Sequence, residues 1–173
     1  MYEKKTCCFT GHRPQKLGYS ENTIQCDQLK QTLKKIIVSL IEKEDVTHFI
    51  SGMARGVDTF AAQIVIDLKK EYPWITLECA IPCETQAEKW HERDRDLYFH
   101  LIAKCDKETL LQHKYTAGCM QRRNEYMVNN SDYVLAVWNG KPSGTGNTVF
   151  YAEKQGKTVI QIEPKTLKLI KSK

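Results

Sequence analysis

The sequence predicts an α/β fold, a three-layer sandwich with a mostly parallel sheet between two layers of helices. Short apolar runs typical of buried strands alternate along the chain with longer segments whose apolar residues fall at helical spacing. Strands separated by helices pair in parallel through right-handed crossovers, which places helices on both faces of the sheet. Loops rich in glycine and hydroxyl side chains follow several strands, where such sheets bind ligands.

The first half of the chain contains three predicted strands. The run 5–10 holds two cysteines and a phenylalanine and is typical of a buried strand. Pro14 stands in the loop that follows, and we expect it to keep a helix from starting at once. Isoleucines and leucines at helical spacing, with lysines on the other side, predict a helix at 21–43. The same patterns then predict a strand at 47–51, a helix at 59–70 and a strand at 75–81.

The second half continues the alternation. Apolar residues at helical spacing, including Trp90, lie among many charges and predict a helix at 85–104. The remaining predicted elements are a strand at 109–112, a helix at 117–130, a strand at 133–138, a helix at 147–155 and a strand at 158–162.

The composition is ordinary for a globular protein. The 173 residues are 41% hydrophobic and 27% charged, which suits one domain with a full core. We expect a single domain at 1–164 and a basic tail at 165–173 that is disordered or folds on a partner. No apolar run is long enough to cross a membrane, and no secretory signal opens the sequence. The protein is therefore expected to be cytoplasmic, without a membrane partner.

The seven cysteines form no Cys-x-x-Cys pair. Cys7, Cys8, Cys79 and Cys105 lie in or beside apolar runs, where a free cysteine behaves as a small buried hydrophobe. Cys79 and Cys83 have no second pair or histidine cluster nearby, which makes a poor zinc site. We expect reduced thiols and no structural metal.

The chain is organised around the stretch 51–58, Ser-Gly-Met-Ala-Arg-Gly-Val-Asp, a predicted strand–loop–helix junction. Gly52 and Gly56 permit backbone conformations closed to other residues and let a ligand approach the main chain. The first N–H groups of the following helix favour an anion such as phosphate, and Arg55 adds a charged donor. A carboxylate at a helix start is more often a cap than a ligand-binding group, so we favour capping for Asp58 and keep ligand binding as the alternative.

Three polar loops are expected at the carboxyl ends of the strands, where ligands bind in parallel sheets. The last of them, at 143–148, precedes a predicted helix, so its backbone N–H groups are able to hold phosphate. Neither the dinucleotide fingerprint nor a P-loop is present, because Val149 stands where the former needs its third glycine and no Gly-Lys-Ser/Thr occurs. The loops are Thr10-Gly11-His12-Arg13, Ser51-Gly52 and Ser143-Gly144-Thr145-Gly146-Asn147-Thr148.

The stretches 10–14, 51–58, 123–128, 130–132 and 144–148, together with Gln86 and Trp90, carry a family resemblance. In these stretches the chain resembles the SLOG superfamily of Rossmann-like proteins, which includes DprA, the LOG phosphoribohydrolases and the YpsA-like proteins. The YpsA-like proteins are the most similar, and the shared stretches span 7–162 in the expected order. The resemblance implies a nucleotide or nucleotide-derived ligand at the strand ends. Superfamily relatives often pair, which implies a homodimer.

The LOG enzymes pair an arginine in a Met-x-x-Arg-Lys-x-x-Met helix with a glutamate in a Pro-Gly-Gly-x-Gly-Thr-x-x-Glu loop. This chain resembles them in keeping the arginine, as Arg123, but Phe150 stands in place of the glutamate. Cleavage of an N-glycosidic bond needs an acid or base, which phenylalanine cannot supply. Glu153, one helical turn further along, is a weak substitute, since glutamate is more common on an exposed helix face.

Other side chains are candidates for ligand contacts as well. His12 either binds phosphate or acts as an acid or base, or makes a structural hydrogen bond, and we weigh these evenly. Arg13 is the better phosphate ligand. Trp138 is more often core than a stacking platform. Arg122 and Arg123 point about 100° apart on a helix, so one of them faces the pocket, and the motif favours Arg123.

The resulting hypothesis is a nucleotide-binding protein with a sensing or regulatory role, because no complete catalytic set is visible. One alternative is a nucleotide or N-glycosidic hydrolase that uses Arg123 with Glu153 or His12. The other is a DprA-like binder of single-stranded DNA, permitted by the net charge of +5 but disfavoured by the scarcity of aromatic residues arranged for stacking. No cofactor is assigned. The expected ligand-binding residues are Thr10, Gly11, His12, Arg13, Ser51, Gly52, Arg55, Gly56, Asp58, Arg123, Gly144, Thr145, Gly146, Asn147 and Thr148.

Overall fold

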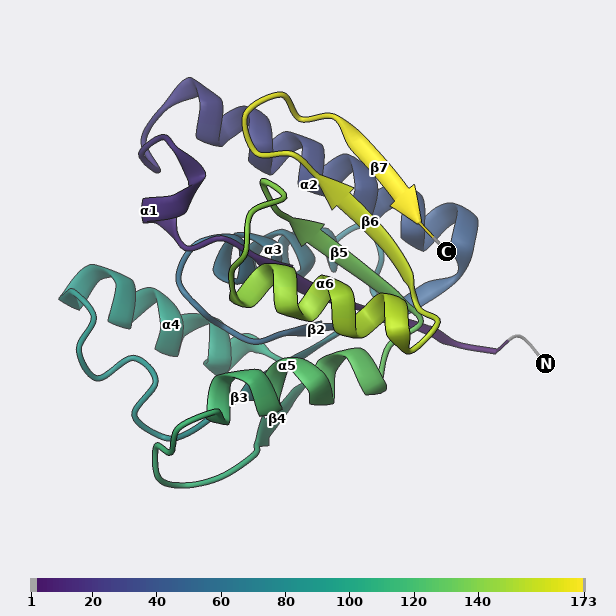
Figure 1. Ribbon diagram of the computed structural model, residues 1–173. Coiled ribbons are helices and arrows are strands. Elements are labelled where there is room, and N and C mark those ends of the chain that lie inside the picture. Colours follow the sequence, from purple (N-terminus) through teal and green to yellow (C-terminus); the bar gives the residue numbers. More distant parts are fainter. Residues whose placement is uncertain (1–2, 173) are drawn as a thin grey trace.

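The computed structural model describes residues 3–172 and contains a seven-stranded sheet (Figure 1). The strand order is β4-β3-β2-β1-β5-β6-β7, and all neighbouring strands are parallel except β6 and β7. The predicted mostly parallel sheet is therefore confirmed. The strands are β1 (Lys5–Gly11), β2 (Val46–Ser51), β3 (Thr76–Ile81), β4 (Lys107–Leu110), β5 (Tyr133–Val137), β6 (Thr158–Ile162) and β7 (Leu169–Ser172).

Helices cover both faces of the sheet, which completes the predicted three-layer sandwich. In β1, Cys7 and Phe9 belong to the core cluster on one face and Cys8 to the cluster on the other, as the alternation of side chains along a strand requires. The first face carries α2, α3 and α4, and the second carries α5 and α6 (Figure 1). The helices are α1 (Pro14–Leu17), α2 (Ile24–Glu44), α3 (Val57–Leu68), α4 (Glu92–Lys104), α5 (Cys119–Asn129) and α6 (Gly144–Lys154).

The strand order reverses between the two central strands, β1 and β5. The chain leaves β1 toward the layer of α2 and leaves β5 toward the layer of α6, so the two loops diverge to opposite faces. A crevice opens at such a switch point, outside the carboxyl ends of the strands. The fold thus provides a place for a ligand between these two loops.

Helix caps fix how the chain enters the layers. The side chain of Thr23 accepts a hydrogen bond from the backbone of Cys26 at the start of α2. Ser143 does the same for Gly146 at the start of α6, at 3.0 Å. Gly56 caps α3 with φ of 93°, and a Cβ there would lie 2.8 Å from the carbonyl oxygen of His12. Glycine is therefore needed where this junction passes under the β1 loop.

Several predicted boundaries are wrong. The helix expected at 85–104 begins only at Glu92, after a series of turns. A short helix, α1, starts directly at Pro14, because the first helical position tolerates a residue without an N–H. The helix expected at 147–155 begins earlier, at Gly144, so the glycines of that loop form its first turn. The edge strand β4 spans Lys107–Leu110 instead of 109–112.

Strand β7 lies inside the segment 165–173, the expected basic tail. It pairs antiparallel with β6, with Gln161 opposite Ile170. Leu167, just before it, packs against the larger core cluster. The segment is therefore ordered on this chain through residue 172. Within 3–172, no helix is both long and apolar enough to cross a membrane.

Candidate functional site

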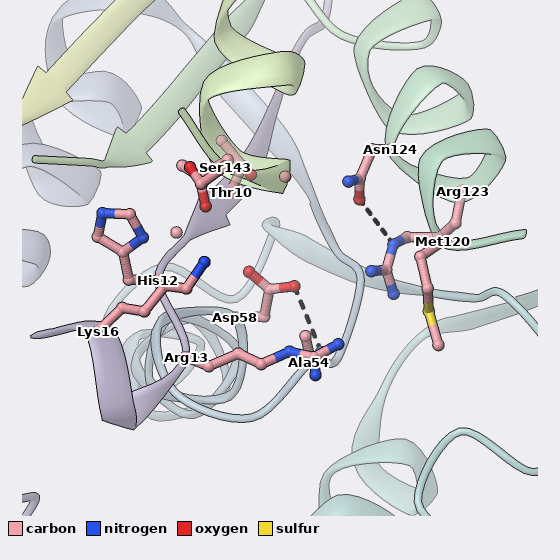
Figure 2. Close-up of a pocket in the computed structure, with 13 residues that line it drawn as sticks. Thr10, His12, Arg13, Lys16, Ala54, Asp58, Met120, Arg123, Asn124 and Ser143 are labelled. Carbon is pink, nitrogen blue, oxygen red and sulfur yellow. Dashed lines mark hydrogen bonds between the residues drawn. The ribbon is translucent and has the colours of Figure 1, made fainter. Parts of the chain in front are cut away.

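A cavity of about 280 Å³ lies at the switch point, beyond the carboxyl ends of β1 and β5. It is bounded by the loop after β1, the junction before α3, the first turns of α5 and the N-terminus of α6. Figure 2 shows Arg13, Lys16 and Arg123 around Asp58 in this cavity. The lining residues are Thr10, Gly11, His12, Arg13, Lys16, Ala54, Asp58, Met120, Arg123, Asn124, Ser143, Gly144 and Thr145.

His12 joins the two loops that flank the crevice. Its side chain is buried, and Nε2 accepts a hydrogen bond from the backbone N–H of Asn139 at 3.1 Å. An accepting Nε2 places the ring proton on Nδ1 and keeps the ring neutral. Burial also lowers the pKa of His12, in agreement with a neutral ring. The structural hydrogen bond is thus present, and His12 lines the cavity as well.

Two exposed cations lie at the mouth of the cavity. Arg13 follows β1, and Lys16 is in α1. Neither side chain has a carboxylate within 4 Å anywhere in residues 3–172. Gly144 and Thr145 line the opposite wall with the N-terminus of α6, where free N–H groups and the helix dipole favour an anion. No ion pair with a described residue therefore neutralises the positive charge at this mouth, and Asp58 is the one carboxylate in the cavity lining.

Arg123 is buried and held in one position. Nη1 donates to the carbonyl oxygen of Gly52 at 2.5 Å and to Oε1 of Gln86 at 3.0 Å, and Nε donates to Oδ1 of Asn124 at 2.8 Å. Among the described residues, Nη2 has no hydrogen-bond partner, so it remains free for a ligand. Arg122 points elsewhere and donates to Gln112 at 2.6 Å. The buried face of α5 therefore delivers Arg123 to the cavity wall.

Position 52 needs a glycine because the side chain of Arg123 lies against it. A Cβ on Gly52 would lie 2.7 Å from Cδ of Arg123, closer than real contacts allow. The next residue, Met53, has φ of 58°, which is uncommon for a bulky side chain. Such backbone strain is concentrated at functional sites. Of the junction 51–58, Ala54 and Asp58 line the cavity. Gly52 instead makes room for Arg123.

Asp58 is the only carboxylate among the residues that line the cavity. It is buried, and Oδ2 accepts a hydrogen bond from the backbone N–H of Ala54 at 3.3 Å. Burial raises the pKa of Asp58 to about 6, although Arg123, the N–H of Ala54 and Arg13 act in the opposite direction. Gly56 occupies the N-cap position of α3. Asp58 therefore holds the loop before the helix and also faces the cavity.

Seven of the expected ligand residues do not line the cavity. Ser51 is buried, and its hydroxyl donates to the carbonyl oxygen of Asp58 at 2.8 Å. Nε of Arg55 lies 3.1 Å from Oδ2 of Asp94 outside the cavity, although its N–H misses hydrogen-bond geometry. The seven residues are Ser51, Gly52, Arg55, Gly56, Gly146, Asn147 and Thr148.

The residues of α6 from Gly146 onward also serve the fold. Gly146 packs against Trp138, where a Cβ would lie 2.9 Å from Cζ2. Nε1 of Trp138 donates to the carbonyl oxygen of Lys141 at 2.7 Å, so this side chain is part of the core and not a stacking platform. Thr148 donates to the carbonyl oxygen of Gly144 at 3.0 Å. Glu153 is exposed on α6 and lies outside the cavity lining.

The sequence reasoning missed five lining residues: Lys16, Ala54, Met120, Asn124 and Ser143. Ser143 and Asn124 belong to the motif stretches, so proximity to the motif was the available signal. Lys16 carried none, because the short helix α1 that presents it was not expected. In residues 3–172, no cluster of histidine, cysteine, aspartate or glutamate side chains is arranged to hold a metal ion.

The sheet order and the cavity define a Rossmann-like α/β protein with a basic cavity at its topological switch point. A family model described as the YspA SLOG family matches residues 7–172. The chain belongs to this family, which confirms the resemblance to YpsA-like proteins.

Similar sequences agree with this assignment. The uncharacterized SPbeta prophage-derived protein YoqJ of Bacillus subtilis is 34% identical over 73% of this chain and 81% of its own. A UPF0398 protein of Halalkalibacterium halodurans is 31% identical over 96% and 87%.

Two structures of DNA processing protein A share the fold. The Streptococcus pneumoniae protein aligns with a TM-score of 0.63 at 16% identity. The Helicobacter pylori protein, whose structure concerns its single-stranded DNA binding mode, aligns with 0.61 at 18%. The alignments cover 92% of this chain but only 50% and 65% of those chains. At these identities the likeness concerns the fold alone.

Proposed function

We propose that this protein binds a nucleotide or nucleotide-derived small molecule at the carboxyl ends of its strands, in a sensing or regulatory role. The observation that carries the proposal is the positive charge of Arg13 and Lys16 at the cavity mouth, which no ion pair neutralises among the described residues. Together with the N-terminus of α6 and the free Nη2 of Arg123, these groups match the several oxygens of a phosphate.

Binding without turnover is favoured by the absence of a carboxylate from α6 in the cavity lining. Phe150, at the position of the LOG glutamate, is 59% exposed, and Glu153 is exposed one turn away. His12 is held neutral by a structural hydrogen bond. The cavity lining thus offers a nucleotide no second carboxylate beside Asp58.

The test is thermal unfolding with a panel of nucleotides, NAD, ADP-ribose and short single-stranded DNA. A ligand at about 100 times its Kd stabilises the folded state by about 2.7 kcal/mol, which raises the Tm by roughly 5–10 °C in a protein of this size. The variant Arg13→Ala/Lys16→Ala removes only exposed side chains without ion pairs. We expect it to fold normally and to lose about hundredfold in affinity for a nucleotide.

The matched control is Arg93→Ala, which removes an exposed charge outside the cavity. It should leave the ligand-induced shift unchanged. A shift with DNA alone, retained by the double variant, would contradict the proposal and favour the DNA-binding alternative.

A second candidate, a nucleotide hydrolase, is favoured by Asp58. Its carboxyl group has a pKa of about 6 and shares the cavity with Arg123, so it is able to exchange a proton near neutral pH. Release of free base from nucleoside monophosphates by the wild type, abolished in Asp58→Asn, would support hydrolysis. Tight binding with no release over hours would leave the binding role standing alone.

A further inference from the structure

We propose that a second hollow, next to the cavity, is the nucleobase site of the same ligand. This inference rests on the proposed nucleotide binding and adds the part of the ligand that gives it specificity. The hollow has a volume of about 320 Å³. It is lined by Cys83, Thr85, Gln86, Glu88, Lys89, Trp90, Tyr115 and Met120.

The two spaces adjoin. Met120, in the first turn of α5, lines both. Gln86 lines the hollow and accepts the hydrogen bond from Nη1 of Arg123, which lines the cavity. The cavity alone, at about 280 Å³, is smaller than the range of about 300–1,000 Å³ typical of small-molecule sites. With the adjoining hollow the site falls inside that range, so a ligand is able to extend from one space into the other.

The two spaces differ in chemistry. Basic side chains and a helix N-terminus line the cavity, and its lining includes no phenylalanine, tyrosine or tryptophan. The hollow has two aromatic side chains, Trp90 and Tyr115, with Thr85, Glu88 and Lys89 as polar groups. A phosphate fits the first environment, and a flat base with a polar edge fits the second.

Both walls of the hollow are built in place. Trp90 packs edge-on against Tyr98, with ring centroids 5.2 Å apart. Tyr115 is 64% exposed, yet the loop that carries it is held by Gln112, whose Nε2 donates to the carbonyl oxygen of Lys114 at 2.7 Å and to Oγ1 of Thr116 at 2.8 Å. An exposed aromatic ring on an anchored loop presents a stacking face at little cost in entropy.

The loops that form the two walls are also tied to each other. The backbone N–H of Glu84 donates to the carbonyl oxygen of His113 at 3.0 Å, and the side chains of the same residues meet at 2.7 Å. The loop after β3 and the loop after β4 therefore keep a fixed separation.

The test is titration calorimetry with pyrophosphate, ribose 5-phosphate and the four common ribonucleoside 5′-monophosphates. We expect one or more nucleotides to bind more tightly than ribose 5-phosphate. Tyr115→Ala, which removes an exposed side chain, should weaken those nucleotides about tenfold and leave ribose 5-phosphate unchanged. Tyr115→Phe keeps the ring and should retain wild-type affinity.

The two proposals fail in different ways. If ribose 5-phosphate binds as tightly as every nucleotide, the base site is wrong while the phosphate site stands. A preference for nucleotides that survives Tyr115→Ala places the base elsewhere and also overturns this inference. If neither pyrophosphate nor any of the phosphates binds, the proposed function fails together with the base site.

Discussion

At the scale of single residues, the site contains a buried arginine, Arg123, and a buried carboxylic acid, Asp58. Arg123 is fixed by three hydrogen bonds, and Asp58 is buried with a backbone N–H as its hydrogen-bond partner. Burying an ionised carboxylate is unfavourable unless a ligand or a cation compensates it. The ionised form of Asp58 should therefore lower the stability of the folded protein.

The pH dependence of stability should reveal Asp58. Its pKa rises from an ordinary 3.8 to about 6 on folding, so the folded state binds the proton more tightly, and stability falls as pH rises through this window. A shift of this size corresponds to roughly 3 kcal/mol at pH 7. Urea unfolding of wild type and Asp58→Asn from pH 4 to pH 7 should show the variant gaining relative stability as pH rises. A constant difference would contradict the account.

Gly52→Ala should test whether glycine is needed where Arg123 approaches the backbone. The added methyl group meets the Arg123 side chain, which is held in place by the hydrogen bonds of Nε and Nη1, so we expect a loss of about 1–3 kcal/mol and weaker nucleotide binding. Gly144→Ala is the control for stability, because a Cβ there meets nothing within 4 Å. Equal unfolding midpoints for the two variants would show that Gly52 is not needed for close approach.

At the scale of elements, a buried polar network ties β2, β3, β4 and α5 together beside the site. Oε2 of Glu78 accepts from Tyr126 at 2.6 Å and from Thr109 at 2.8 Å, and Oε1 lies 2.9 Å from Nε2 of His48. Burial alone would raise the pKa of Glu78, but these hydrogen bonds outweigh it and lower the pKa to about 2. The network fixes α5, and with it Arg123, against the sheet.

Tyr126→Phe should therefore destabilise the protein. It removes a hydrogen bond to a buried charge, which costs about 1.5–3 kcal/mol. Tyr151→Phe is a matched control, because its hydroxyl donates to Asn129 in an exposed pair at 2.7 Å and should contribute little. Chemical denaturation at pH 7 measures both. Equal effects of the two substitutions would show that the Glu78 network carries no special stability.

The sequence was most informative for elements whose pattern is local. The central strands β1, β2 and β5 are buried runs, and α2 has a capping threonine and helical spacing, so periodicity alone located them. The turns at 85–91 depend on Gln86 reaching Gly52 and Arg123, which lie far away in the sequence. A local pattern does not contain such contacts.

At the scale of the whole molecule, the order of the strands in the sheet determines where the site lies. The spacing of apolar residues along the sequence does not reveal this order. The rule that ligands bind at the carboxyl ends brought Thr10, Gly11, Arg13 and Gly144 together correctly in the cavity lining. The same rule did not distinguish residues that line the cavity from Ser51 and its neighbours, which support it from behind. The pairing of β7 with β6 was likewise not predicted, since Leu169–Ser172 lies inside the lysine-rich segment 165–173.

The whole fold resembles part of two DNA processing proteins, but the chain spans only 50% and 65% of them.

The central prediction is that a phosphate binds between the loop after β1 and the N-terminus of α6. The most direct measurement is a crystal structure with a saturating nucleotide. We predict the phosphate within hydrogen-bond distance of Arg13 or Lys16 and of the first N–H groups of α6. A phosphate bound outside this cavity would contradict the account.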